Sequence, residues 1–380
     1  MAGCLHDVFN RFAFLKESPA STIGRCIAAH WVTIICSLTQ RDDKNSQSSP
    51  GARLSPSKLR GVLLPIITPF RSNGDVDADG FRSDIQKWNR TGIAGYVVLG
   101  STGERVHLNE REYLQVVETA RVEVPSGPDG LAFIVGAGQQ STRGTIDEIK
   151  KAAGAGADAV LVITPHFYRA AITQEALIDH YTAVADGSPV PVILYSVPDF
   201  TGIKIQPETV ARLSGHQNLI GVKDSSADVT GVKETVKLVR EFSKRSPEEF
   251  AVLTGNGTLL YEALRAGACG AILAVGCVAP QLCIEIFRAV KAGEHKRASA
   301  LQEKLAPLGL AVTTKYGIGG LKAALDMNGY TGGAVRAPLR EPSKEARSDI
   351  ARLLGEANAV LDEEWLNDSD LKTVSFEQAQ

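Results

Sequence analysis

The chain has 380 residues, of which 44% are hydrophobic, and its formal net charge is −2. This length suits a single α/β barrel with extensions, because a barrel of that class occupies about 250 residues. The small net charge disfavours a nucleic-acid-binding protein, whose affinity comes largely from cationic contacts to phosphates. The six cysteines lack the spacing of metal ligands, so we expect reduced thiols and no metal site.

The first 57 residues are expected to lie outside the fold, as an N-terminal extension that is either disordered or a targeting segment. Residues 40–57 are polar and contain two prolines, which is typical of a linker. Arginine and serine favour a mitochondrial transit segment, whereas the acidic residues Asp7, Glu17 and Asp42 disfavour it. We therefore expect a cytoplasmic location, with a mitochondrial one as the alternative. No apolar run reaches the roughly 20 residues of a membrane-spanning helix, so we expect no membrane partner.

Short apolar runs recur after the extension, and each is nearly continuous rather than alternating. Continuous apolar runs are typical of parallel strands that are covered on both faces of the sheet. There are eight of them, at residues 61–70, 94–100, 132–138, 159–166, 191–198, 219–225, 250–256 and 270–276.

Segments with a helical period separate these runs. Phe81, Ile85 and Trp88 fall on one helical face, and Asn109 followed by Glu112 has the pattern of a capping box. Eight alternations of strand and helix predict a (β/α)8 TIM barrel, with a doubly wound open sheet as the alternative.

The expected organisation is an extension over residues 1–57, the barrel over residues 58–279, and additional helices with a tail over residues 280–380. We expect four helices in that last part, at residues 280–292, 295–308, 317–328 and 343–365.

Lys223 stands near the end of the sixth apolar run, in the sequence Leu-Ile-Gly-Val-Lys-Asp-Ser. Lysine is rare inside an apolar strand, because burying an ammonium without a partner is costly. Burial favours the uncharged amine, which is a nucleophile and forms a Schiff base with a carbonyl substrate. The alternative is a lysine at the strand end whose ammonium reaches water.

Other polar residues end the predicted strands, where a TIM barrel gathers its catalytic groups. These are Thr68, Ser101, Thr102, Tyr195, Ser196, Ser225 and Asn256. The turn at residues 100–104, Gly-Ser-Thr-Gly-Glu, has the glycines that let backbone amides converge on an anion, although an ordinary tight turn has the same pattern. Residues 136–138, Gly-Ala-Gly, lack the third glycine of a dinucleotide fingerprint, so we expect no such cofactor.

Four motifs, taken in chain order, resemble the dihydrodipicolinate synthase/N-acetylneuraminate lyase family of Schiff-base aldolases. They are Thr-Pro-Phe at 68–70, the turn at 100–104, the Tyr-x-x-Pro-x-x-Thr-Gly segment at 195–202, and Lys223. The resemblance covers roughly residues 61–339 and implies a TIM barrel that acts on a 2-oxo acid. It also implies that neither a cofactor nor a metal is needed, since the iminium formed on the lysine serves as the electron sink.

The resemblance implies roles for individual residues. Lys223 is the Schiff-base lysine and Tyr195 the general acid/base, while Ser101 and Thr102 relay protons and their turn amides bind the pyruvyl carboxylate. Three further substrate-binding residues are expected: Ser225, Gly255 and Ile272.

Within the family, the pattern is most similar to the 4-hydroxy-2-oxoglutarate aldolase branch. The similar segments are Tyr-Ser-Val-Pro at 195–198, Val-Lys-Asp-Ser at 222–225 and Arg-Ala-Pro-Leu at 336–339. The expected reaction is the cleavage of 4-hydroxy-2-oxoglutarate to pyruvate and glyoxylate. Phe200 stands where dihydrodipicolinate synthase has a carboxylate-binding arginine, and a phenyl ring cannot replace a guanidinium.

Alternative functions keep the same scaffold. A 2-keto-3-deoxy sugar-acid aldolase or a dehydratase would use the same iminium, and dihydrodipicolinate synthase or a non-catalytic barrel is less favoured. The resemblance also implies a homotetramer, although Phe167 stands where many relatives have an interface tyrosine.

Overall fold

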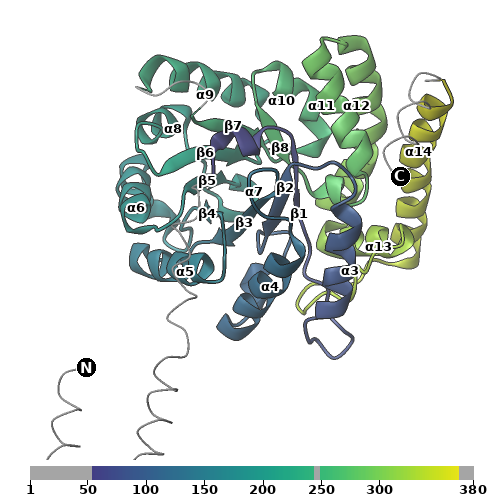
Figure 1. Ribbon diagram of the computed structural model, residues 1–380, viewed down its shortest axis with the longest axis horizontal. Coiled ribbons are helices and arrows are strands. Elements are labelled where there is room, and N and C mark those ends of the chain that lie inside the picture. Colours follow the sequence, from purple (N-terminus) through teal and green to yellow (C-terminus); the bar gives the residue numbers. More distant parts are fainter. Residues whose placement is uncertain (1–53, 244–248, 368–380) are drawn as a thin grey trace, which may run out of the picture. The chain divides into compact units, whose positions relative to one another are not determined.

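The structure is a computed structural model that describes residues 54–243 and 249–367 (Figure 1). Most of the expected N-terminal extension and the end of the expected C-terminal tail lie outside the described residues. Within the described ranges, the three cysteines Cys269, Cys277 and Cys283 are free thiols. In the same ranges, no helix combines the length and the apolar character that a membrane span requires.

Eight parallel strands close into a barrel in chain order, which confirms the predicted TIM barrel. Closure is completed by β1 pairing with β8, where Leu63 lies opposite Ile272, and this pairing excludes an open sheet. The strands are β1 Val62–Pro65, β2 Gly95–Val98, β3 Ala132–Ala137, β4 Ala159–Ile163, β5 Val192–Ser196, β6 Leu219–Asp224, β7 Ala251–Thr254 and β8 Gly270–Ile272.

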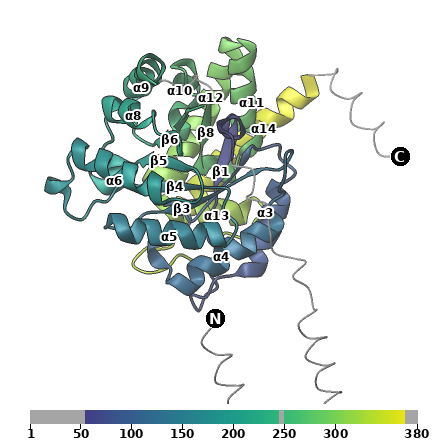
Figure 2. The same ribbon diagram turned by 60° about the vertical axis from the view of Figure 1, so that its left-hand side comes forward.

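Helices surround the strands in both ribbon views (Figures 1 and 2). The capping box is confirmed: the Asn109 side chain accepts from the Glu112 amide at 3.0 Å, and the Glu112 carboxylate accepts from the Asn109 amide at 3.0 Å. The helices that connect the strands are α3 Ala78–Trp88, α4 Glu110–Glu123, α5 Thr142–Gly154, α6 Gln174–Gly187, α7 Pro198–Thr201, α8 Pro207–Leu213, α9 Val229–Phe242 and α10 Leu260–Arg265.

The C-terminal helices lie where the sequence predicts them, but the first of them belongs to the barrel. They are α11 Pro280–Ala292, α12 His295–Leu310, α13 Gly317–Met327 and α14 Lys344–Asn367. Helix α11 follows β8 after the short 3-10 helix Ala274–Cys277 and packs against β1, so it completes the eighth strand–helix unit and the barrel continues past residue 279. Helices α12, α13 and α14 are the additional elements, and α14 packs against both of the others (Figure 1).

Apolar side chains fill the barrel interior from its N-terminal end. Leu59, on the short 3-10 helix Pro56–Leu59, is fully buried among Leu63, Ile134 and Leu253 of the strands. The Lys58 ammonium anchors this helix by donating to the Gly130 carbonyl at 2.6 Å. Because this end is closed by packed side chains, polar chemistry is left to the opposite end, where the strands finish.

Candidate active site

Lys223 lies on β6 and is 5% exposed, so the alternative of an ammonium in water does not hold. Its neighbour in register on β5 is Tyr195, and the Lys223 Nζ atom lies 4.3 Å from the centre of the Tyr195 ring. Asp224 is the next residue on the strand, where successive side chains point to opposite faces, and its carboxylate accepts from the Ser226 amide at 2.7 Å. Among the described residues, no carboxylate forms an ion pair with Lys223.

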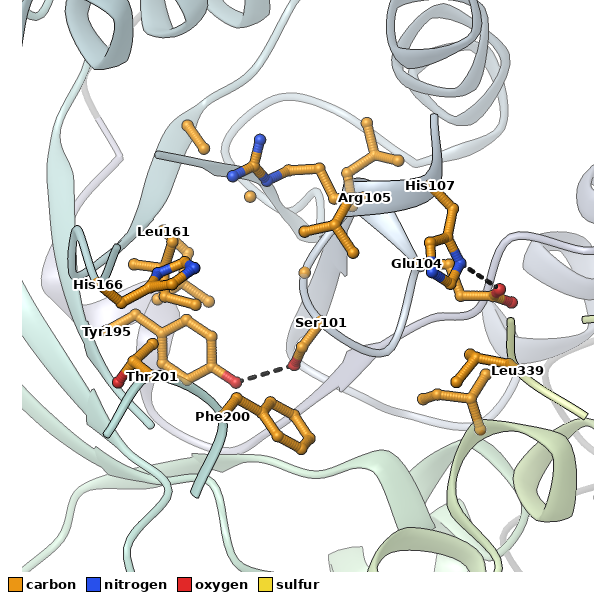
Figure 3. Close-up of a pocket in the computed structure, with 17 residues that line it drawn as sticks. Ser101, Glu104, Arg105, His107, Leu161, His166, Tyr195, Phe200, Thr201 and Leu339 are labelled. Carbon is orange, nitrogen blue, oxygen red and sulfur yellow. Dashed lines mark hydrogen bonds and ion pairs between the residues drawn. The ribbon is translucent and has the colours of Figure 1, made fainter. Parts of the chain in front are cut away.

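Tyr195, the neighbour of Lys223 in register, forms a polar contact with Ser101, which Figure 3 shows as a dashed line. The Tyr195 hydroxyl lies 3.0 Å from Ser101 Oγ, and Tyr195 is 4% exposed whereas Ser101 is half-buried. A proton can therefore pass between the buried phenol and a hydroxyl nearer to solvent. Thr102 is buried in the same turn, but its hydroxyl does not bond to Tyr195 in the described structure.

The turn after β2 leaves two backbone amides available to an anion. The Gly103 amide donates to the Gly100 carbonyl at 3.1 Å and the Glu104 amide donates to the Ser101 carbonyl at 3.2 Å, which closes the turn. Within the part of the chain that the structure describes, the amides of Ser101 and Thr102 donate to no protein group. They are the donors that the family resemblance implies for the pyruvyl carboxylate.

The conformation of this turn is strained and is held by its surroundings. Leu99, just before the turn, and Glu104, its last residue, have φ values of 57° and 53°, in the left-handed region that costs a non-glycine residue on the order of 1 kcal/mol or more. A Cβ atom on Gly136 would come within 2.1 Å of the Leu99 carbonyl oxygen. The glycine at 136 therefore makes room for the turn.

A buried ion pair behind the turn was not predicted from the sequence. Glu104 is 2% exposed and Lys322, on α13, is 1% exposed, and the Lys322 Nζ atom lies 2.6 Å from Glu104 Oε1. His107 Nδ1 contacts Glu104 Oε2 at 3.1 Å, and the Lys322 ammonium donates to the Ala334 carbonyl at 2.6 Å. Burial lowers the pKa of the Lys322 ammonium, and the Glu104 carboxylate opposes that shift.

Arg336 fastens the segment after α13 to the same end of the barrel. Its Nη1 and Nη2 atoms donate to the two carboxylate oxygens of Glu112 at 2.9 and 2.5 Å, and this contact holds the Glu112 pKa below its usual value. The guanidinium also donates to the carbonyls of His107 and Gly74 at 2.7 Å and lies 4.2 Å from the centre of the Phe70 ring. The Arg-Ala-Pro-Leu segment thus begins with an anchoring residue.

One sequence feature points toward the ion pair. Lys322 is the single lysine of the apolar helix Gly317–Met327, and a lysine on such a helix requires a partner when the helix is buried. Its partner could not be identified from the pattern, because Glu104 is distant in the chain and also ends a turn that has its own role.

A cavity of about 310 Å³ lies next to Tyr195 and Ser101 (Figure 3). Its walls are mostly apolar and come from several strand ends and from the C-terminal segment. The apolar residues include Leu161, Ile163, Phe200, Ile318 and Leu339. The polar residues include Ser101, Arg105, His166 and Tyr195.

The predicted site residues Ser225, Gly255 and Ile272 do not line this cavity, and the first two lie beside the lysine. A Cβ atom on Gly255 would come within 2.8 Å of Lys223 Cε and 2.0 Å of Ser225 Oγ, so the glycine leaves room for both side chains. Ile272 is fully buried in the interior cluster that also contains Tyr195. Among the described residues, no group of histidine, cysteine and acidic side chains gathers to hold a metal ion.

Comparisons with known proteins found relatives of this chain in sequence and in fold. The model of the dihydrodipicolinate synthetase family matches residues 58–357 of the chain. The 4-hydroxy-tetrahydrodipicolinate synthase of Methanothrix thermoacetophila is 36% identical over 296 residues, which are 78% of this chain and 96% of that protein. The protein of the same name from Nitrobacter hamburgensis is 36% identical over 289 residues, which are 75% of this chain and 92% of that protein.

Solved structures show the same fold. Dihydrodipicolinate synthase from Thermotoga maritima is 31% identical with a TM-score of 0.73, and the match covers 79% of this chain and 99% of that one. YagE from Escherichia coli K12, a prophage protein of the dihydrodipicolinic acid synthase family solved in complex with pyruvate, is 26% identical with a TM-score of 0.71. That match covers 79% of this chain and 98% of YagE.

Proposed function

Because the chain belongs to the dihydrodipicolinate synthetase family, we propose that it is a Schiff-base lyase of 2-oxo acids with Lys223 as its nucleophile. The observation that carries the proposal is a buried lysine with no carboxylate partner among the described residues, in register with a tyrosine that is hydrogen-bonded to a turn serine. YagE, a relative in fold and sequence, was solved with pyruvate, which is the 2-oxo acid this chemistry would release.

In the proposed reaction, Lys223 Nζ attacks the C2 ketone of the substrate and water leaves, which gives an iminium. Tyr195 removes the proton from the C4 hydroxyl, the C3–C4 bond breaks, and its electron pair passes into the iminium to form an enamine. The aldehyde leaves, the enamine is protonated at C3, and water hydrolyses the resulting iminium to free pyruvate and the lysine. Ser101 relays the proton between Tyr195 and solvent, since the two hydroxyls are 3.0 Å apart.

The turn amides of Ser101 and Thr102 are proposed to hold the pyruvyl carboxylate. Two aligned amides stabilise an anion without a cation, and the buried Glu104–Lys322 ion pair keeps the turn in its strained conformation. Ser225 is proposed to contact the substrate beyond C3, because it lies beside Lys223 across Gly255.

We propose 4-hydroxy-2-oxoglutarate as the substrate, with pyruvate and glyoxylate as the products. The similarity of residues 195–198, 222–225 and 336–339 to that branch of the family supports this substrate. The test is a pyruvate-release assay on the purified protein with 4-hydroxy-2-oxoglutarate and a panel of 2-keto-3-deoxy sugar acids. Preferred release from a sugar acid, or loss of water without aldehyde, would replace the proposal with the aldolase or dehydratase alternative.

The names of the relatives favour a second candidate, 4-hydroxy-tetrahydrodipicolinate synthase. Against it stands Phe200, which lines the cavity, is 69% exposed and has no hydrogen-bond donor for a carboxylate. A direct assay for formation of 4-hydroxy-tetrahydrodipicolinate separates the two, and turnover in that assay above the lyase rate would favour the second candidate.

We propose that the protein is a homotetramer, as the family resemblance implies, and that one of its subunit interfaces lies near this site. Phe167 and Tyr168 follow the cavity residue His166 and are 74% and 71% exposed in the single chain, as expected for aromatic side chains that a neighbouring subunit covers. Sedimentation of the purified protein tests this, and a monomer at micromolar concentration would contradict it.

A further inference from the structure

Arg105 is a cavity residue that the proposed reaction does not yet use. It opens the 3-10 helix Arg105–His107 directly after the turn at 100–104. Its side chain lines the cavity together with Tyr195 and Ser101, as Figure 3 shows. Of the described residues that line the cavity, Arg105 alone is an arginine or a lysine.

The Arg105 guanidinium is held in place but its donors are not all used. Nη1 donates to Glu148 of α5 at 2.7 Å, and Nη2 donates to the Gly138 carbonyl. The Glu148 carboxylate is shared, because it also accepts from the Gly138 amide at 2.7 Å and from Gln139 Nε2 at 2.9 Å. An arginine carries five N–H donors, so donors remain for a ligand while the contact with Glu148 fixes the orientation of the fork.

The Glu148 carboxylate that pairs with Arg105 at 2.7 Å is not in the cavity wall and is shared with Gly138 and Gln139, so the surroundings of the remaining Arg105 donors favour an anion over a neutral group. Most cavity walls are apolar, and a charge interacts more strongly in such surroundings than in water. Among the described residues of the wall, Glu104 alone is acidic, and it is already paired with Lys322. His107 is bonded to Glu104, and Phe200 offers no donor.

We propose that Arg105 binds the distal carboxylate of the substrate, so that the site selects 2-oxo acids with a second carboxylate. The inference rests on the proposed function, because the ketone end must be held at Lys223 and the turn amides while the other end reaches Arg105. The turn amides take the carboxylate next to the ketone, and Arg105 takes the one at the far end of the chain.

The test uses two ligands that need not be cleaved, 2-oxoglutarate and 2-oxopentanoate, which differ by the distal carboxylate. Their Kd values for the wild-type protein and for Arg105→Met are measured by calorimetry. The wild type is expected to bind 2-oxoglutarate about 10- to 100-fold more tightly, the size of a charge-assisted hydrogen bond, and the preference is expected to vanish in Arg105→Met. A wild-type ratio near one, or an unchanged ratio in the variant, overturns the proposal.

A matched control distinguishes carboxylate binding by Arg105 from a purely structural role. Glu148→Gln removes the charge of the partner but keeps a side-chain oxygen that accepts from Arg105 Nη1, so the guanidinium stays oriented and the preference for 2-oxoglutarate should be retained. If Glu148→Gln loses the preference as fully as Arg105→Met, the arginine acts only through its anchor and the proposal is overturned. Borohydride reduction of each complex reports on Lys223 separately. A preference that persists without any adduct at Lys223 would refute the Schiff-base proposal and leave the assignment of Arg105 standing.

Discussion

Two lysines are buried at the same end of this barrel, and their surroundings differ. Lys223 on β6 is 5% exposed and faces the Tyr195 ring, with no carboxylate partner among the described residues. Lys322 on α13 is 1% exposed, lies 2.6 Å from the Glu104 carboxylate and donates to the Ala334 carbonyl. The Glu104 carboxylate offsets the cost of burying the Lys322 ammonium, whereas no carboxylate among the described residues does so for Lys223.

This difference suits Lys322 to a structural role and Lys223 to a reactive one. A paired ammonium holds two segments together, and Lys322 does so between α13 and the turn after β2. An amine without a carboxylate partner is free to react with a carbonyl, and Lys223 stands next to a phenol that can move the necessary proton. Burial of a lysine alone therefore does not identify a catalytic residue, and the lack of an acid partner is the feature on which the proposed role of Lys223 rests.

The largest expected effect is on activity, at the lysine without a carboxylate partner. Lys223→Met should lower kcat by about 1,000-fold or more, because no other described side chain replaces the nucleophile. Its free energy of unfolding should stay equal or rise, since methionine fills the same space without an amine to desolvate. Steady-state kinetics and urea unfolding check both parts, and a clear loss of stability with activity retained would reverse the roles of the two lysines.

Tyr195→Phe should keep the Schiff base and lose turnover. Removing the hydroxyl deletes the contact with Ser101, and loss of a general acid/base lowers kcat by about 100- to 10,000-fold. Ser101→Ala is the matched control, since it keeps the phenol and should lose less. Turnover at the wild-type rate in Tyr195→Phe would exclude the phenol from the reaction.

The paired lysine should show its effect in stability. Lys322→Met leaves the Glu104 carboxylate buried without its cation, which is expected to cost about 3–5 kcal/mol of unfolding free energy. The double variant Lys322→Met/Glu104→Gln should recover part of that loss, because the unpaired charge is gone. Urea unfolding of Lys322→Met, Glu104→Gln and the double variant measures the coupling, and additive losses would show that the two side chains do not stabilise each other.

The smallest expected effect concerns pH, at another contact that anchors the segment after α13. Asp84 is fully buried and accepts from the Thr331 amide at 2.9 Å, and burial raises its pKa to about 6. The folded protein then binds a proton that the unfolded chain has released between about pH 4 and pH 6, so stability falls as pH rises through that window. The loss of unfolding free energy across that window is at most ~3 kcal/mol.

Asp84→Asn keeps an oxygen that accepts from Thr331 and removes the charge. The variant should therefore gain stability relative to wild type at pH 7, and the gain should shrink toward pH 4. Urea midpoints between pH 4 and pH 7 test this, and a constant difference across that range would exclude ionisation of Asp84 as its source.

The barrel could be predicted because each of its elements shows a pattern within one short stretch of sequence. Each strand is a continuous apolar run, and the capping box of α4 requires only Asn109 and Glu112. Lys223 and Tyr195 could be expected to lie close together because both stand near the ends of neighbouring strands. The assignment of α11 to the barrel was missed, because its contact with β1 forms only when the sheet closes.

The contacts that hold the site could not be predicted in the same way. Glu104, Lys322 and Arg336 come from separate segments that meet only in the folded chain. The orientation of Arg105 toward the cavity depends on Glu148 of another helix. Such pairs depend on tertiary packing, which no periodicity or spacing within one segment reports.

The most direct test of the contrast between the two lysines is peptide mapping after reduction. The protein is incubated with pyruvate, reduced with borohydride and digested, and the modified peptide is identified by mass spectrometry. One pyruvyl adduct is expected, on Lys223, and Lys322 is expected to stay unmodified. An adduct on Lys322, or none on either lysine at saturating pyruvate, would contradict this expectation.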